Sequence, residues 1–273
     1  MDVVSHLLPK LKQLRLSGIL ETLELRNRQA VEEQVSYIEF LARLLEDEVE
    51  RRGQKQLALR LRRSGLDPAK TLEAFDFSFN ASVNRKQIFD IATCAFVERA
   101  EGVWLIGPAG VGKSHLAQAL GHEAVRRGYD VLFVRTSVML ASLYAGRADG
   151  SYDRRLLTYL RPDVLILDDF GLKPMRPPAT EDIYDVIDGR YQRAPTLLTT
   201  NRDFTEWPEL FDQPVLASAA LDRMAHGATQ ITITGDSYRA KGPRPRTRSK
   251  AEKPDKPQKP SSGENEDSET RES

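Results

Sequence analysis

Eight consecutive residues, from glycine 107 to serine 114, carry the clearest chemical signal in this sequence. They read Gly107-Pro108-Ala109-Gly110-Val111-Gly112-Lys113-Ser114, which is the glycine, lysine and hydroxyl spacing of a phosphate-binding loop. Glycines let the backbone curl so that several N–H groups point into one cavity, and the lysine adds a full positive charge for phosphate oxygens. We therefore expect this loop, together with the following His115, to bind a nucleotide such as ATP.

Two neighbouring carboxylates complete a possible metal and water site. The apolar run Val164-Leu165-Ile166-Leu167 leads directly into Asp168 and Asp169. A buried strand with this ending delivers acidic groups to the carboxyl edge of a sheet, where open α/β sheets bind ligands. We expect Asp168 and the Ser114 hydroxyl to hold Mg²⁺. We expect Asp169, which points elsewhere, to orient or deprotonate an attacking water.

A third polar group follows another apolar run. Asn201 comes after Leu197-Leu198-Thr199-Thr200, and at the end of a strand its amide can hydrogen-bond a γ-phosphate or the attacking water. A turn-forming asparagine after a strand is the simpler alternative.

The elements that must position these groups follow an alternating pattern. Short apolar runs predict strands at 103–106, 131–134, 164–167, 197–200 and 231–234, and helical periodicity separates them. We expect residues 146–155, which are mostly polar, to form an exposed loop. Alternating strands and helices predict an α/β fold, in which a mainly parallel sheet is covered by helices on both faces.

We expect this α/β core to span residues 75–240. The regions on either side of it do not show its alternation of strands and helices. Residues 1–74 show apolar residues at three- and four-residue steps, which predicts a helical domain with a break near Ser17-Gly18. Its second long pattern ends in a basic stretch, which either complements the dipole of its own helix or contacts a phosphate backbone. Residues 241–273 are basic and then acidic, without an apolar pattern, so we expect a disordered tail.

Composition narrows the class of protein. The 273 residues carry 40 basic and 40 acidic side chains, so the formal net charge is zero and only local clusters are informative. One cysteine excludes an internal disulfide and fits a reducing compartment. No apolar stretch has the length of a membrane span, and the N-terminus lacks the apolar centre of a signal peptide. We expect a cytoplasmic protein with no membrane partner.

Five motifs together resemble a known family. They are Gly-Lys-Ser-His-Leu-Ala at 112–117, Leu-Ile-Leu-Asp-Asp-Phe-Gly at 165–171, Thr-Thr-Asn at 199–201, Leu-Asp-Arg-Met at 221–224 and Gly-Asp-Ser-Tyr-Arg at 235–239. They resemble the IstB-like proteins, AAA+ ATPases that assist the transposase of bacterial insertion sequences, and the likeness spans about residues 5–240. After the last predicted strand only the tail remains, so the usual C-terminal helical lid of AAA+ proteins has no room.

The resemblance implies a role for each matching residue. Lys113 and Ser114 look like the Walker A lysine and magnesium ligand, and Asp168 looks like the Walker B aspartate. Asp169 takes the place where many AAA+ ATPases have a catalytic glutamate. Asn201 resembles sensor 1. Arg223 resembles an arginine finger acting on the nucleotide of a neighbouring subunit, the alternative being a helix-surface ion pair with Asp222 or another acid.

The resemblance also implies partners and leaves alternatives open. It implies an ATP-dependent homo-oligomer that assembles on double-stranded DNA and presents it to a transposase. The candidate DNA contacts are basic residues outside the nucleotide site, namely Arg51, Arg52, Arg60, Arg147, Arg154, Arg155 and Lys173. A replicative helicase loader of the DnaC type shares the same core. A metabolic P-loop kinase and a nucleotide-gated module that barely hydrolyses ATP are further alternatives.

Overall fold

The computed structural model describes residues 3–238, with side chains from residue 6 onward. The tail predicted for residues 241–273 lies outside the described residues.

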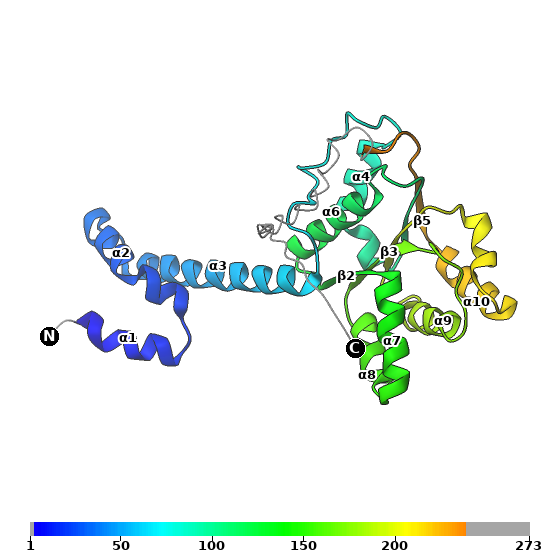
Figure 1. Ribbon diagram of the computed structural model, residues 1–273. Helices are drawn as coiled ribbons and strands as arrows, with labels where there is room; N and C mark the ends of the chain where they lie inside the picture. The colour runs from blue at the N-terminus through cyan, green and yellow to red at the C-terminus, as the bar shows by residue number, and fades with distance from the viewer. Residues whose placement is uncertain (1–2, 239–273) are drawn as a thin grey trace, which may run out of the picture. The chain divides into compact units, whose positions relative to one another are not determined.

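A five-stranded parallel sheet lies among the helices of residues 85–238 (Figure 1), which confirms the predicted α/β class. The strand order is β2-β3-β4-β1-β5, and every described strand pair is parallel. The strands are β1 (Val103–Ile106), β2 (Val131–Arg135), β3 (Val164–Phe170), β4 (Thr196–Thr200) and β5 (Thr229–Thr232). Each begins within two residues of its predicted position, because each apolar run is short and lies between turn or helix signals.

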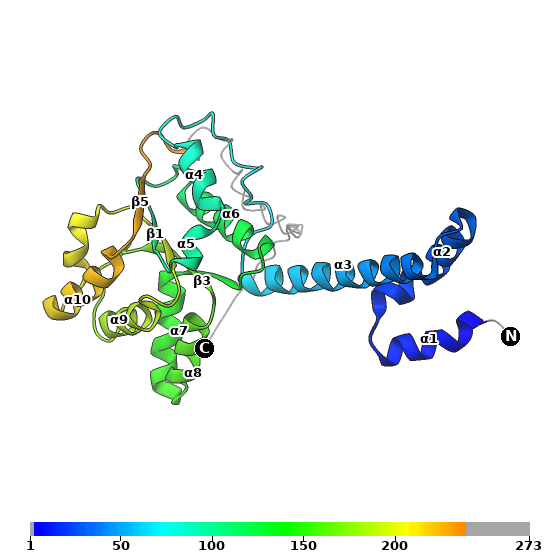
Figure 2. The ribbon, with the colours of Figure 1, turned by 180° about the vertical axis from the view of Figure 1, so that it is seen from behind.

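Helices bury both faces of the sheet, as Figures 1 and 2 show from opposite sides. Side chains alternate along each strand, so Leu105 packs on one face and Trp104 on the other. The first face carries α4 (Arg85–Ala92), α5 (Ala95–Glu98) and α6 (Lys113–Arg126). The second carries α7 (Thr136–Asp149), α8 (Tyr152–Leu160), α9 (Ala179–Arg190), the 3₁₀ helix η1 (Phe204–Leu210) and α10 (Pro214–Ala225).

The predicted exposed loop at 146–155 is wrong. Helix α7 continues to Asp149, and α8 begins at Tyr152 after a tight turn at Gly150, whose φ of 70° is left-handed. The Arg147 guanidinium lies 4.4 Å from the centre of the Tyr152 ring, which joins the two helices. A polar segment without apolar periodicity does not distinguish exposed helix ends from a loop, and this explains the error.

The N-terminal region is helical, as predicted. It consists of α1 (Val3–Gln13), α2 (Ser17–Glu33) and α3 (Tyr37–Ser64), and the predicted break near Ser17-Gly18 lies between α1 and α2. A small cluster of Ile19, Leu23 and Leu44 joins α2 to α3. The buried Glu48 carboxylate of α3 accepts the Gly18 N–H at 2.6 Å, so a side chain from another helix caps the start of α2.

The second half of α3 and the segment after it pack on the sheet domain. Leu57 and Leu61 contact the core cluster, and Leu66 and Leu72 belong to it. The segment is tied to α6 through Asp67, whose backbone N–H donates to Gln118 and whose carbonyl oxygen bonds the His122 ring. The division into residues 1–74 and 75–240 stays a prediction.

A buried arginine connects the loops at the amino edge of the sheet. Arg190 is 2% exposed, and its guanidinium donates to the carbonyl oxygens of Tyr159, Pro162 and Pro195, among others. Burial lowers the pKa of Arg190 to about 10, so it stays charged at neutral pH. Among the described helices none is both long and apolar enough to cross a bilayer.

Two helical glycines provide opposite expectations for stability. A Cβ at Gly18 would lie 2.6 Å from the Asp47 carbonyl oxygen of α3, so Gly18→Ala should lower the free energy of unfolding by about 1–3 kcal/mol. A Cβ at Gly53, inside α3, meets nothing within 4 Å, so Gly53→Ala should raise it by about 0.5–1 kcal/mol. Urea unfolding followed by circular dichroism measures both. Equal effects of the two changes would contradict the close crossing of α2 and α3.

Candidate nucleotide-binding site

The loop from Gly107 to Gly112 connects β1 to α6, as the sequence predicts. Gly107 has a φ of 153°, and a Cβ there would clash with the Ile233 carbonyl oxygen. Gly110 has a φ of 86°, and a Cβ there would overlap the Ser237 hydroxyl. Larger residues at these positions would displace the segment after β5, which explains the glycines. Helix α6 begins at Lys113, and the His115 and Leu116 N–H groups donate to the Gly112 carbonyl oxygen at 3.0 Å, so the loop leads directly into the helix.

The functional side chains of the loop lie around one cavity. Lys113 is 6% exposed, and its ammonium donates to the carbonyl oxygens of Gly107 and Pro108, each at 2.7 Å. It therefore lies along the inner side of the loop. His115 also faces the cavity, but its ring bonds the Thr71 carbonyl oxygen at 2.9 Å and contacts Phe75 edge to face. His115 thus anchors the segment before the sheet to α6.

The cavity has a volume of about 440 Å³, and it brings together most of the predicted nucleotide-site residues. Asp169 and Asn201, from the carboxyl ends of β3 and β4, face the phosphate loop across it. The loop side is formed by Ala109, Gly110, Val111, Gly112, Lys113, Ser114 and His115. The rest of the lining is formed by Lys70, Ala74, Phe75, Asp76, Phe79, Asn80 and Tyr238.

The two predicted carboxylates are separated by a distortion of β3. The β3–β4 register shifts between Leu167 and Phe170, and Asp169 has a left-handed φ of 57°. Asp168 is 5% exposed and accepts the Thr199 hydroxyl at 2.6 Å, whereas Asp169 reaches the cavity. The Asp169 N–H donates to the same Thr199 oxygen at 3.0 Å. One threonine hydroxyl therefore fixes the Asp168 carboxylate and the Asp169 backbone.

The oxygen-bearing side chains at this cavity suit a cation that takes some of its ligands from the phosphates of the nucleotide. Within residues 6–238, side chains offer no cluster of three or more His, Cys, Asp or Glu that would hold a metal alone. Mg²⁺ bound with a nucleotide takes one or two carboxylates and the phosphates, often through water. Ser114 lines the cavity, and the buried Asp168 lies behind it without lining it. These residues fit Mg²⁺ brought in with ATP, with Asp168 acting through water or directly.

The part of the lining that lies outside the loop and the strand ends was not anticipated as part of the site. The Phe79 and Tyr238 rings meet edge to face with centres 4.8 Å apart, and the Tyr238 N–H donates to the Gly110 carbonyl oxygen at 2.9 Å. The Asn80 amide bonds the Thr234 carbonyl oxygen at 2.6 Å. The Phe75-x-Phe77-x-Phe79 alternation was the available signal. It suggested an extended segment, but turns bring Phe75 and Phe79 to the cavity.

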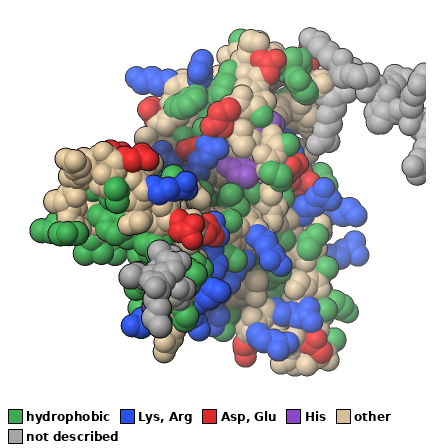
Figure 3. All heavy atoms as spheres, turned by 90° about the vertical axis from the view of Figure 1, so that its left-hand side faces the viewer, with side chains coloured by type: hydrophobic (Ala, Val, Ile, Leu, Met, Phe, Trp, Pro, Cys, Tyr) green, Lys and Arg blue, Asp and Glu red, His purple; other side chains and the backbone are tan. Residues whose placement is uncertain are grey.

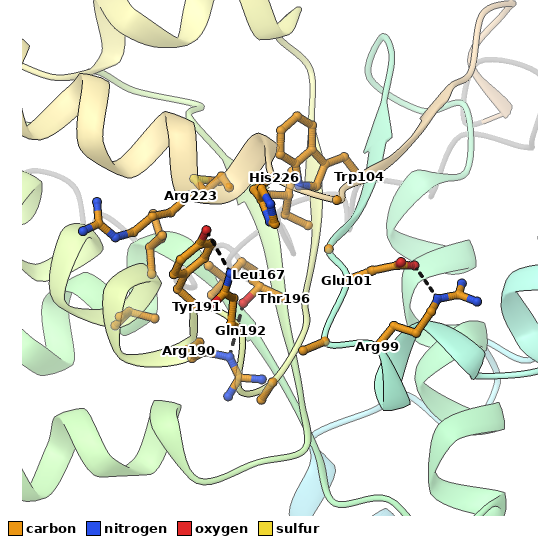
Figure 4. A pocket seen from close by; sticks show the side chains of 18 residues that line it. Arg99, Glu101, Trp104, Leu167, Arg190, Tyr191, Gln192, Thr196, Arg223 and His226 are labelled. Carbon is orange, nitrogen blue, oxygen red and sulfur yellow. Dashed lines mark hydrogen bonds and ion pairs between the residues drawn. The ribbon is translucent and has the colours of Figure 1, made fainter.

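Arg223 lies away from the nucleotide cavity of its own chain. It borders a separate pocket of about 280 Å³ between α9, α10 and the start of β1, which shares no lining residue with the nucleotide cavity. Its guanidinium points away from Trp104 in this pocket (Figure 4). Arg223 Nε lies 2.9 Å from Asp188, an ion pair on the helix surface. This pair is of the kind expected without a finger role, although the acid is Asp188 and not Asp222.

The candidate DNA contacts do not form one continuous group. Most are ion-paired: Arg51 with Glu21, Arg52 with Glu48, Arg60 with Asp130, Arg147 with Asp182 and Arg155 with Asp149. Figure 3 likewise shows acidic side chains between the Lys and Arg side chains of the face that it draws. Arg154 and Lys173 have no ion pair with any residue in the described range. Among the candidate contacts, these two are the side chains without a described acidic partner.

The parallel sheet and phosphate-loop cavity define a P-loop nucleotide-binding protein of the AAA+ class. The sequence model of the IstB-like ATP binding proteins matches residues 9–246. An insertion-sequence ATP-binding protein of Mycobacterium tuberculosis is 41% identical over 232 residues, which are 85% of this chain and 92% of that protein. The IS21 ATP-binding protein of Pseudomonas aeruginosa is 41% identical over 243 residues, 88% and 90% of the two chains. The chain belongs to the IstB-like ATP-binding proteins.

Solved structures agree with the fold. The DnaC helicase loader is 26% identical with a TM-score of 0.50, covering 56% of this chain and 91% of that one. DnaA bound to AMPPCP and single-stranded DNA is 21% identical with a TM-score of 0.53, covering 64% and 53%. The DnaC and DnaA structures confirm the AAA+ P-loop architecture that the sequence predicts.

The Thr199 hydroxyl, which bonds both the Asp168 carboxylate and the Asp169 N–H, can be tested by substitution. Thr199→Val keeps the shape of the side chain but removes the hydroxyl that Asp168 and Asp169 both contact. We expect ATP turnover to fall at least about tenfold, with nucleotide affinity changed by less than about twofold, because the binding loop is untouched. Steady-state turnover and nucleotide titration measure the two quantities.

Thr196→Val, at the other end of β4, is the matched control. Its hydroxyl bonds only the Arg190 side chain, at 3.2 Å and far from the carboxylates. It should cost some stability and leave turnover near the original value. If both variants lost turnover equally, the bonds of the Thr199 hydroxyl to Asp168 and Asp169 would not explain the loss.

Proposed function

We propose that this protein is a Mg²⁺-dependent AAA+ ATPase that assembles on duplex DNA and assists the transposase of an insertion sequence. The observation that carries the proposal is the cavity in which the phosphate loop faces Asp169 and Asn201. The insertion-sequence context of the relatives from M. tuberculosis and P. aeruginosa supports a role in transposition. DNA-stimulated hydrolysis, self-assembly, the transposase partner and a cytoplasmic location are parts of the proposal.

The proposed reaction is hydrolysis of ATP at its terminal phosphate. The oxygen of water bonds to the γ-phosphorus while the bond to the β–γ bridging oxygen breaks, giving ADP and phosphate. Asp169 accepts the proton of the water, and Asn201 hydrogen-bonds the water or a γ-phosphate oxygen. Lys113 offsets negative charge on the transferred group. Mg²⁺ would supply further charge neutralisation when bound.

The proposed assembly follows from the position of Arg223. This side chain lies outside the nucleotide cavity of its own chain, so a finger role requires a neighbouring subunit. ATP bound between subunits would then hold the oligomer together, and hydrolysis would release it. Such a finger contributes on the order of 10³–10⁵ in rate.

Particle size tests the assembly. With a non-hydrolysable ATP analogue, we expect a large particle by light scattering only when duplex DNA is also present, at low and moderate salt. Lys113→Ala should weaken both nucleotide binding and assembly, because it removes the charge that faces the phosphates.

Two outcomes would contradict the proposal. A persistent monomer that ignores duplex would remove the basis for an arginine finger acting in trans. A particle that forms on single strands, or only with a replicative helicase, would favour the helicase-loader alternative. The likeness of this chain's fold to that of the DnaC helicase loader is also consistent with that alternative.

The unpaired basic residues provide a test of duplex binding. Arg154→Ala and Lys173→Ala should each lower duplex affinity and reduce the slope of log affinity against log salt by about 1, because each removes one phosphate contact. The control is Arg193→Ala, which removes an equal charge from an exposed turn between α9 and β4. Equal loss from all three variants would indicate net charge and not a defined contact surface.

A further inference from the structure

The Arg223 side chain lies in a three-sided cradle on helix α9. Arg223 Nε lies 2.9 Å from an Asp188 carboxylate oxygen, which makes an ion pair. The guanidinium carbon lies 5.4 Å from the centre of the Tyr184 ring and 5.9 Å from that of Tyr191. We call Tyr184, Asp188 and Tyr191 the arginine cradle. Tyr184 and Asp188 come from α9, Tyr191 caps the C-terminal end of that helix, and the guanidinium comes from α10.

The sequence spacing of the three cradle residues explains why they lie on one side of α9. Residues 184, 188 and 191 are four and three positions apart, which places them on the same face of an α-helix. The neighbouring positions Ile183, Val186 and Ile187 are buried in the core, so the rotation of α9 about its axis is fixed. The cradle is therefore set by the packing of α9 on the sheet.

The contacts occupy only part of the guanidinium. An arginine side chain has five N–H groups in a rigid fork. Nε binds Asp188, and Nη1 donates to the Ala219 carbonyl oxygen of its own helix at 2.9 Å. Within the described part of the chain, Nη2 has no hydrogen-bond partner. Nε and Nη1 are therefore held by these contacts, and Nη2 is available to an anion.

The Arg223 side chain lies partly at the surface. The Arg223 side chain is 28% exposed and Asp188 is 49% exposed, so the ion pair is solvated. A solvated pair of this kind contributes little to stability. Two tyrosine rings and a carboxylate surround this partly exposed arginine and restrict its rotamers. Such restriction is useful when the arginine must meet an external group in a defined orientation.

We propose that Tyr184, Asp188 and Tyr191 are positioning residues that orient Arg223 toward a phosphate oxygen of the nucleotide bound by a neighbouring copy of this chain. The inference rests on the proposed function, in which Arg223 acts between subunits. Asp188 fixes the Nε edge, the tyrosine rings fix the plane of the fork, and the Nη2 edge meets the phosphate. The cradle residues themselves do not contact the nucleotide.

The first test compares two aspartates that are close to Arg223 in different ways. Asp188→Ala removes the cradle carboxylate, whereas Asp222→Ala removes an exposed acid next to Arg223 in sequence that makes no ion pair with any described residue. Alanine favours helix at both positions, so folding should be preserved. We expect Asp188→Ala to lower kcat about tenfold, with nucleotide affinity and analogue-induced particle size unchanged, and Asp222→Ala to do neither.

The second test uses mixed assemblies. Asp169→Asn protomers bind nucleotide without hydrolysing it and keep Arg223, whereas Arg223→Ala protomers keep an intact nucleotide site. Mixed together, they should hydrolyse ATP faster than either alone, because each nucleotide site of one type can receive Arg223 from the other. Adding Asp188→Ala to the Asp169→Asn protomer should remove most of this gain. Adding it to the Arg223→Ala protomer should not.

The outcomes separate the cradle from the proposed function. If the mixture gains nothing, the finger role of Arg223 in trans is wrong, and the proposed assembly fails. If the mixture gains activity but Asp188→Ala lowers it equally in either protomer, the cradle does not act through Arg223. An increase in kcat on Asp188→Ala would also overturn the proposal, because it would mean that Asp188 withholds Arg223 from the neighbouring site.

Discussion

The parallel pairing of β1 with β4 is the constraint on which the site depends. Ile106 is in register with Thr200, and the Gly107 N–H donates to the Thr200 carbonyl oxygen at 3.2 Å. The phosphate loop and Asn201 therefore leave the sheet side by side. Because β3 lies on the other side of β4, Asp168 and Asp169 reach the same edge. Residues distant in sequence meet here because parallel strands end together.

Burial on both faces makes this edge rigid. Leu105, Ile166 and Leu197 pack beneath one layer of helices, and Trp104, Leu165 and Leu198 beneath the other. A central strand held on two faces moves little, so polar groups at its end are oriented before any ligand arrives. Thr199, which lies in the strand itself, holds the Asp168 carboxylate and the Asp169 backbone N–H. The segment after β5 completes the cavity through the Tyr238–Gly110 bond.

The position of Arg223 gives the fold a functional asymmetry. The phosphate loop lies at the carboxyl edge of the sheet, whereas Arg223 lies beside α9 near the start of β1 and outside that cavity. A reaction that needs both therefore needs two copies of the chain. In this proposal, ATP hydrolysis is coupled to assembly by geometry, because an isolated chain holds the nucleotide without the charge that completes the site. The cradle on α9 then links the interior packing of one subunit to catalysis in the next.

The sequence alone determined the phosphate loop, the strands that flank it, the α/β class and the family, because these depend on short-range signals: glycine and lysine spacing, apolar runs and a few adjacent motifs. It did not reveal that 146–155 joins two helices, that Phe79 and Tyr238 line the cavity, or that Thr199 bonds both the Asp168 carboxylate and the Asp169 N–H. It also left open which acid pairs with Arg223; only the packing of α10 on α9 selected Asp188 over Asp222. Such contacts join residues far apart along the chain, and their partners are fixed only when strands align and helices pack.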